Sequence, residues 1–256
     1  MIAHVTIETA LRNGVTYLKK AYYSPPLKVA DITEMRNERQ LQLMLMSASP
    51  GMLDEDRYHI KITLEEHCAL QLTTQAYQHL FSMRKGAAQH MEVQMAKGAS
   101  FCYLPYPVVP HQDAMFTGTS KVFLYDDCVL TWGEVVTSGR KLNGEHFLFS
   151  GYHNNTEIYL NQKLVIRENL YMKPFDNSVL GIGQMEGYSH QGSIICLSPS
   201  GLSSETLAEI QDFLSAQPDM LFGITAAPVK GIMVRILGNK AEQLHHCLKT
   251  IHRLAA

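Results

Sequence analysis

The stretch that decides the fold is residues 99–149, ASFCYLPYPVVPHQDAMFTGTSKVFLYDDCVLTWGEVVTSGRKLNGEHFLF. Three prolines lie near its start, Pro105, Pro107 and Pro110. Proline fixes its own φ, has no N–H to donate, and pushes the preceding residue towards extended geometry. Residues 104–111 should therefore be extended but unable to form an ordinary central strand. Strand-like runs follow at 121–125, 129–136 and 146–150, separated by turn signals at 126–127, 138–140 and 143–144.

The chain on either side of this stretch continues the alternation of short strands and turns. Strands are expected at 5–11, 41–47, 59–64, 68–74, 89–95 and 193–197, with an extended segment at 22–26. Residues 152–164 predict a strand pair, with turns at Asn154-Asn155 and Asn161-Gln162. The pattern suggests a sandwich, a barrel or stacked sheets. We predict a mainly β fold with a stacked-sheet, β-helix-like body over residues 1–197.

The character of the sequence changes at Ser198. Helical spacing of apolar residues begins after Ser203 and ends near Pro218, and a second helical pattern follows Gly238-Asn239. Two strands, 221–226 and 231–237, are expected between the helices. We predict that residues 198–256 form an α-β-β-α unit packed on the β body, so that the chain is one domain overall.

Composition excludes several classes of protein. Of 256 residues, 46% are hydrophobic and 18% are charged, which is typical of a globular fold. A net charge of −2 and the lack of a basic run give no electrostatic basis for nucleic-acid binding. No apolar run is long enough to span a membrane, and the start of the chain lacks a signal-peptide core. Five widely spaced cysteines without a CxxC pair predict free thiols and a cytoplasmic protein.

Motifs for catalysis and for stable metal binding are absent from the sequence. The twelve histidines form no HxH, HExxH or Cys/His cluster, and neighbouring helical histidines such as His245-His246 point in different directions. There is no G-x-S-x-G elbow and no phosphate-binding loop lysine. A metal-dependent hydrolase stays open as an alternative if the fold brings His111, His153 and His190 together. A β-rich interaction protein without a metal role is a second alternative.

Charged residues inside the strand-rich part are the remaining candidates. We expect Glu134, Arg140, Glu145, Arg167 and Glu168 to be enclosed by strands. Buried charges are costly unless they are paired or solvated, so we interpret Arg140 and Glu145 as a structural ion pair across a turn.

Several motifs resemble the urease accessory protein UreD (UreH) family. The main ones are L-P-x-P-x-x-P at 104–110 and W-x-E-x-x-x-x-G-R-x-x-x-G-E-x-F at 132–147. Four shorter ones occur in family order: YYSPPL at 22–27, TTQA at 73–76, R-E-x-L at 167–170 and G-Y-x-H at 187–190. The resemblance implies a non-enzymatic maturation scaffold that binds UreF, which recruits the GTPase UreG. The assembly, a dimer of heterocomplexes, would dock on apo-urease and deliver Ni²⁺, without a tightly bound cofactor and with only transient Ni²⁺ contact.

The resemblance also implies roles for individual residues. Glu134 and Glu168 match acidic positions that line an internal water-filled passage for nickel, with Asp56 and Thr73 as further candidates. A partner-docking surface or a structural motif is implied for Pro105, Pro107, Pro110, Trp132, Arg140 and Glu145. Two departures from the family pattern weaken the assignment of family roles to the residues around them. His79 or a neighbouring residue stands where the family usually has a lysine, and Glu55-Asp56 replaces a glycine-aspartate pair.

Overall fold

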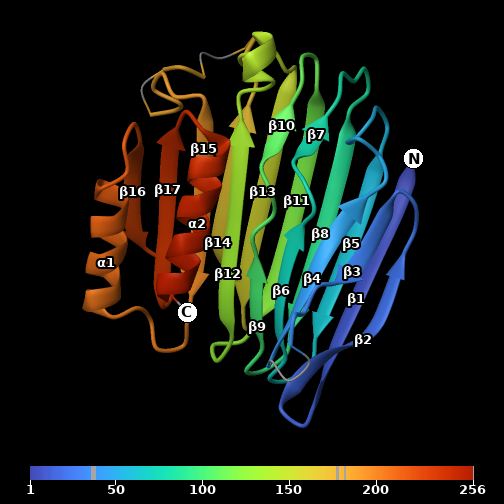
Figure 1. Cartoon of the computed structure of the whole chain (residues 1–256), viewed down its shortest axis with the longest axis vertical. Coiled ribbons are helices and arrows are strands. Elements are labelled where there is room, and N and C mark those ends of the chain that lie inside the picture. Colours follow the sequence, from blue (N-terminus) through green and yellow to red (C-terminus); the bar gives the residue numbers. More distant parts are fainter. Residues whose placement is uncertain (36–38, 177–178, 182, 256) are drawn as a thin grey trace.

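A computed structural model describes residues 1–35, 39–176, 179–181 and 183–255 (Figure 1). The described residues form two β-sheets and two helices. The first sheet has the order β14 (Lys163–Met172), β13 (Gly151–Leu160), β11 (Met115–Leu124), β8 (Ala87–Met95), β5 (Arg57–Leu64), β1 (Ile2–Arg12) and β2 (Val15–Tyr23). The second has the order β16 (Leu221–Ala226), β17 (Gly231–Gly238), β15 (His190–Leu197), β12 (Val129–Thr137), β9 (Ser100–Tyr103), β6 (Ala69–Thr74), β4 (Gln40–Ser47) and β3 (Leu27–Asp31). Two short strands, β7 (Gln78–Leu80) and β10 (Val108–Pro110), join the second sheet beside this path.

The chain passes repeatedly from one sheet to the other between β4 and β13. Pairs in the middle of each sheet are parallel, such as β5 with β8 and β6 with β9, whereas the pairs β1–β2, β13–β14 and β15–β17 are antiparallel. Alternate residues of each strand point into one shared apolar core, as the burial of Ile60, Ile62 and Leu64 on β5 illustrates. The predicted mainly β class is confirmed, and the finer β-helix-like description stays a prediction.

The C-terminal helices lie on one side of the second sheet (Figure 1), where the last helix contacts β15, β12 and β17 and the first helix packs against the last. Helix α1 (Ser204–Ser215) begins at Ser203, whose hydroxyl accepts a hydrogen bond from the Thr206 N–H, as an N-cap should. Helix α2 (Ala241–Ala255) buries Leu244 and Leu248 in a second apolar cluster. Both predicted helices and both strands between them are confirmed. The division at residue 198 stays a prediction, although β16 and β17 extend the second sheet of the body.

Three local predictions are wrong. Residues 22–26 are not extended throughout, because β2 ends at Tyr23 and the chain turns at Pro25-Pro26, where the Leu27 N–H donates to the Ser24 carbonyl. Residues 146–150 are not a strand, because Phe147 takes a positive φ of 54° and its N–H donates to the Ser138 carbonyl, which bends the segment into the core. Asn154-Asn155 is not a turn, because both residues lie inside β13 and continue its alternation. The turn at Asn161-Gln162 is confirmed, and both of its residues have positive φ.

The proline-rich segment is extended and joins no sheet as a central strand, as predicted. Only the three residues of β10 pair, with β7 and with one residue of β12. Pro107 and Pro110 are buried, and Tyr106 packs its ring 4.7 Å from that of His245 on α2. This burial favours the structural-motif interpretation of the segment over the docking interpretation.

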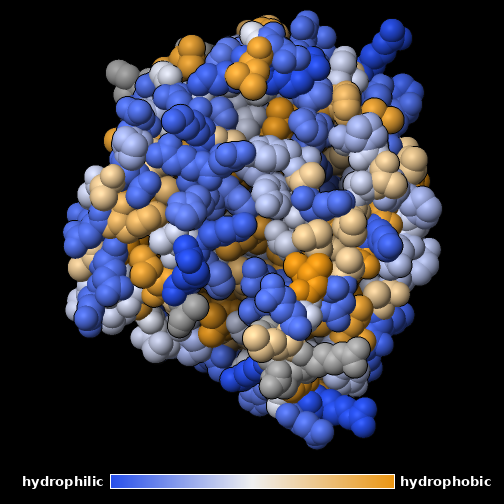
Figure 2. All heavy atoms as spheres, viewed as in Figure 1, coloured by the Kyte–Doolittle hydropathy of each residue, from blue (hydrophilic) through white to orange (hydrophobic). Residues whose placement is uncertain are grey.

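Neither α1 nor α2 combines the length and hydropathy of a membrane-crossing helix. The face drawn in Figure 2 is mostly hydrophilic, with hydrophobic residues in scattered groups rather than in one continuous band.

Packing of α2 on the second sheet should be a major source of stability. Leu248 is 1% exposed, so Leu248→Ala removes buried methyl groups and leaves a cavity. We expect the free energy of unfolding to fall by about 2–5 kcal/mol in urea titrations. Leu142, which is 101% exposed, is the matched control, and Leu142→Ala should change the value by no more than about 0.5 kcal/mol. Equal effects of the two substitutions would contradict this packing.

Candidate functional site

A carboxylate lies between the two sheets and accepts hydrogen bonds from both. Glu134 is on β12 of the second sheet, and the indole N–H of Trp132, two residues earlier, donates to its Oε1 over 3.0 Å. From β13 of the first sheet, the Asn154 amide donates to Oε2 over 2.6 Å and the Thr156 hydroxyl to Oε1 over 3.4 Å. Three donors therefore converge on one acid. Residues two apart on a strand point to the same face, which explains why Trp132 and Glu134 on β12, and Asn154 and Thr156 on β13, face each other.

Burial dominates the electrostatics of this acid. It raises the pKa of Glu134 above the ordinary value, because a charged carboxylate is poorly solvated there, while the three donors oppose the shift. The neighbouring carboxylate of Glu168 raises the pKa further. Burial also raises the pKa values of the Tyr103 and Tyr152 hydroxyls, and the charge of Glu134 adds to both shifts.

A small cavity of about 20 Å³ lies beside Glu134. Its lining comes from β12, β13, β14 and β15: Glu134, Val136, Tyr152, Asn154, Glu168, Leu170, Gln191 and Ser193. A cavity of this size holds one water molecule, and polar groups line it on several sides. It shares three of these residues (Glu168, Leu170 and Gln191) with a wider hollow of about 400 Å³ that includes Arg235 and residues 183–186.

Glu168 stands where the small cavity meets the wider hollow. Its two carboxylate oxygens accept hydrogen bonds of 2.9 and 2.7 Å from Nη2 of Arg235 on β17. The Glu168 side chain is 21% exposed and that of Arg235 is 63% exposed, so the pair closes this end of the cavity from the solvent side. An exposed pair of this kind is weak, because water and salt screen it.

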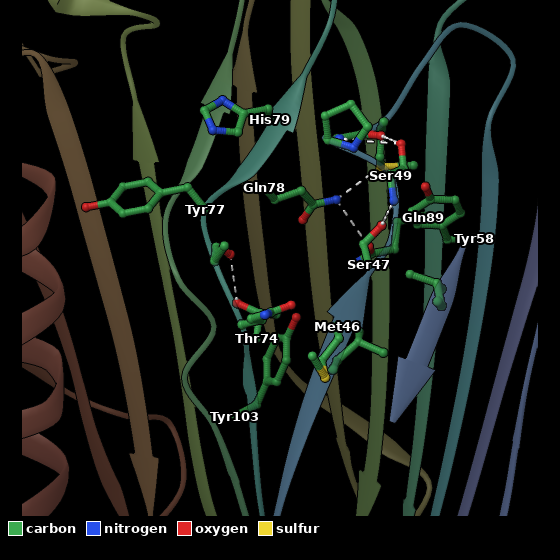
Figure 3. A pocket seen from close by; sticks show the side chains of 17 residues that line it. Met46, Ser47, Ser49, Tyr58, Thr74, Tyr77, Gln78, His79, Gln89 and Tyr103 are labelled. Carbon is green, nitrogen blue, oxygen red and sulfur yellow. Dashed lines mark hydrogen bonds between the residues drawn. The ribbon is translucent and has the colours of Figure 1, made fainter. Parts of the chain in front are cut away.

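A third cavity, of about 240 Å³, enters the space between the sheets at β4, β6 and β7 (Figure 3). Gln78 points into it and donates to Gln89 on β8 over 3.4 Å. The hydroxyl of Tyr58 is buried there with no hydrogen-bond partner among the described residues, and burial raises its pKa to about 12. Tyr103 lines the same cavity and packs its ring 4.7 Å from that of Trp132, the residue that donates to Glu134.

The other candidate acid, Asp56, and the candidate threonine, Thr73, do not line the cavity beside Glu134. Asp56 is buried at the start of β5, where it pairs with the amino terminus of Met1 over 2.9 Å and accepts from the Leu53 N–H. Thr73 donates to the Leu104 carbonyl over 3.0 Å, and it is its neighbour Thr74 that lines the third cavity.

The expected ion pair between Arg140 and Glu145 is confirmed, with Nε of Arg140 donating to Oε2 over 3.0 Å. The pairing lowers the pKa of Glu145. The expectation that both arginines are enclosed is wrong, since the Arg140 side chain is 41% exposed and that of Arg167 57%. Arg167 instead pairs with Glu157, the outward-facing residue opposite it on β13, because the alternation of β14 turns it away from the core.

The three histidines of the hydrolase alternative have separate partners. His111 contacts His79, His153 contacts Asn169, and His190 contacts Ser189. Across residues 1–35, 39–176, 179–181 and 183–255, no group of three or more His, Cys, Asp or Glu side chains could hold a metal ion. The described structure therefore provides no ligand set for a metal-dependent hydrolase.

Several residues of this site were missed in the sequence. Asn154 was assigned to a turn, although its spacing from Tyr152 and Thr156 is the alternation of a strand. Arg235 is the one charged residue in the strand 231–237, which is a usable signal for a special role. Nothing in the sequence pairs it with Glu168, 67 residues away.

Comparisons with known proteins agree over almost the whole chain. A family model described as "UreD urease accessory protein" matches residues 1–256. A protein of Flavobacterium johnsoniae named "Urease accessory protein UreD" is 39% identical over 99% of this chain and 92% of its own length. Proteins of the same name from Acetivibrio thermocellus and Haemophilus influenzae are 31% and 32% identical, over 97% and 99% of this chain and 95% and 98% of their own lengths.

The raised pKa of Glu134 predicts a pH-dependent loss of stability. In the unfolded chain the pKa of Glu134 is near the ordinary 4.5, so the folded protein keeps the Glu134 proton to a higher pH than the unfolded chain does. The free energy of unfolding therefore falls as the pH rises from 4.5 to the raised pKa, by about 1.4 kcal/mol per pH unit. We expect this fall to be absent from Glu134→Gln, measured by urea titration across that range.

Glu209→Gln is the control for this comparison, because Glu209 is exposed on α1. Its stability profile should run parallel to that of the wild type. A Glu134→Gln profile that also runs parallel to the wild type would contradict the raised pKa.

Proposed function

This chain belongs to the family of UreD urease accessory proteins, and we propose that it serves urease maturation as a non-catalytic scaffold that conducts Ni²⁺ to the enzyme. Two carboxylates facing one cavity between the sheets, Glu134 and Glu168, carry the proposal. They come from opposite sheets, so a cation between them would travel inside the molecule. Both are the residues that the family resemblance selects for such a passage.

The cavities suggest a course for the ion. The wider hollow of about 400 Å³ and the small cavity share Glu168, so an ion entering from the hollow meets this acid before Glu134. Tyr103, whose hydroxyl is close enough to Glu134 for the charge of that acid to raise its pKa, lines the third cavity of about 240 Å³. The proposed passage runs along these cavities, with side-chain movement at the Glu168–Arg235 pair and near Tyr103.

The chemistry of the lining suits transport rather than storage. Single carboxylates, amides and hydroxyls bind a divalent ion through few oxygens and leave the other positions to water. Such binding is weak enough to be released, which conduction along a pore requires. An ion at Glu168 must first displace the Arg235 guanidinium, whose exposed pairing is easily broken.

The partners follow from the family resemblance. We propose that the chain binds UreF, that UreF recruits the GTPase UreG, and that a dimer of these heterocomplexes docks on apo-urease in the cytoplasm. GTP hydrolysis on UreG would release the ion. The scaffold needs a rigid body for this work, and the shared core of the two sheets provides one.

Urease activation in cells tests the proposal. Glu134→Gln and Glu168→Gln, each introduced with the structural and accessory genes, should lower activation roughly tenfold, as a barrier higher by about 1.4 kcal/mol would. Pull-down of UreF and apo-urease from the same cells should be unchanged, because both acids lie inside the molecule.

The exposed acid Glu209 again provides the control, and Glu209→Gln should activate urease as the wild type does. Full activation by both passage variants would overturn the conduction proposal. If both the pull-down of UreF and apo-urease and the activation of urease are lost, the acids support assembly of the complex and not the path of the ion.

A further inference from the structure

Two histidines at the edge of the third cavity point ring nitrogens at each other, and His79 is one of the residues that line this cavity. His79 is the middle residue of β7, and its backbone pairs in register with Val109 on β10. His111 follows β10 directly, and its N–H donates to the Leu80 carbonyl over 2.8 Å. Neighbouring paired strands therefore fix both Cα positions, so the meeting of the two side chains is a property of the backbone.

The distance between the nitrogens matches that of two ligands on one metal ion. Nδ1 of His79 and Nε2 of His111 are 3.0 Å apart, with ring planes at 71°. Imidazole nitrogens bind Zn²⁺ at about 2.0–2.1 Å. Two bonds of this length place their nitrogens about 2.9 Å apart at the right angle of an octahedral ion and about 3.3 Å apart at the tetrahedral angle of Zn²⁺. A small rotation of both rings would aim their lone pairs at a shared ion.

The surroundings hold the pair in place and keep it neutral. Phe81 packs its ring 4.7 Å from that of His111, which is buried, while His79 is half-buried. Burial lowers the pKa values of both histidines, so both are in the neutral form that binds metals. Arg140 adds to the lowering, but its charge is balanced by Glu145, which also faces His111.

We propose that His79 and His111 together bind one divalent transition-metal ion, through Nδ1 of the first and Nε2 of the second. Imidazole ligands suit Ni²⁺, Zn²⁺ and Cu²⁺, and water would fill the other positions. In the metal-free protein one of these two nitrogens carries a proton and donates a hydrogen bond to the other. When the ion binds, that proton moves to the other nitrogen of the same ring. With only two protein ligands the ion exchanges readily. The site is built from these two rings and uses neither Glu134 nor Glu168, although His79 lines the third cavity of the proposed passage.

Another cluster of histidines has the wrong geometry for this chemistry. His4, His59 and His90 stack in a row on the outer face of the first sheet, with ring centroids 5.1 and 5.3 Å apart. Stacked rings lie face to face, so their nitrogens do not converge on one point. This row is therefore the natural internal control for surface binding of metal.

Calorimetric titration of the purified full chain with Ni²⁺ tests the proposal, with the absorption spectrum of added Co²⁺ as a second readout of nitrogen ligation. His79→Gln and His111→Gln should each weaken binding at one saturable site by at least about tenfold, the lower limit seen even for outer-sphere partners. His59→Gln, which removes the centre of the stacked row, should bind as the wild type does. Glu168→Gln should also bind normally, which separates this site from the acids of the proposed passage.

Thermal unfolding of each variant shows whether it is folded. If one substitution destabilises the chain, the other variant still tests the site, and the Co²⁺ absorption spectrum reports on nitrogen ligation in the folded proteins. Unchanged Ni²⁺ affinity in folded His79→Gln and His111→Gln would overturn the proposal. Loss of the site in His59→Gln alone would overturn it as well, because the ion would then belong to the stacked row.

Discussion

The interior of this protein is organised around a carboxylate that must be solvated where water is scarce. Glu134 sits between two sheets, and donors from both sheets take the place of most of its water. An apolar residue there would pack at lower cost, because a buried charge loses solvation that hydrogen bonds only partly restore. The acid therefore places a demand on the fold: β12 and β13, which belong to different sheets, must face each other so that Asn154 and Thr156 reach it.

The same demand explains the arrangement around the acid. Parallel pairing in the middle of each sheet places the inward residues of successive strands in rows, and the apolar rows form one continuous core. At β12, β13, β14 and β15 the inward-facing rows include polar residues, and a small cavity lies between them. The apolar core continues around this cavity, because Val136 and Tyr152 belong to the core and also line the cavity.

The C-terminal unit contributes to the site as well as to the core. Strand β17 extends the second sheet and supplies Arg235, which neutralises Glu168 at the outer end of the cavity. Helix α2 covers the proline-rich segment and buries Tyr106 against His245. A segment that the sequence marks as distinct in character is therefore part of the same structure, joined to the body by strand pairing between β15 and β17.

Local patterns in the sequence determined the mainly β class, both C-terminal helices, the restricted pairing of the proline-rich segment, and the pairing of Arg140 with Glu145 five residues away. These features depend on neighbouring residues, whose preferences act over a turn or a strand. Phe147 and Asn154 departed from prediction because burial in the core, not local propensity, fixes their backbone. Tertiary structure alone decided which sheet each strand joins, and with it the meeting of Glu168 with Arg235 and of His79 with His111. Those contacts join residues that are far apart in the chain, and the crossing of the chain between sheets sets their distances.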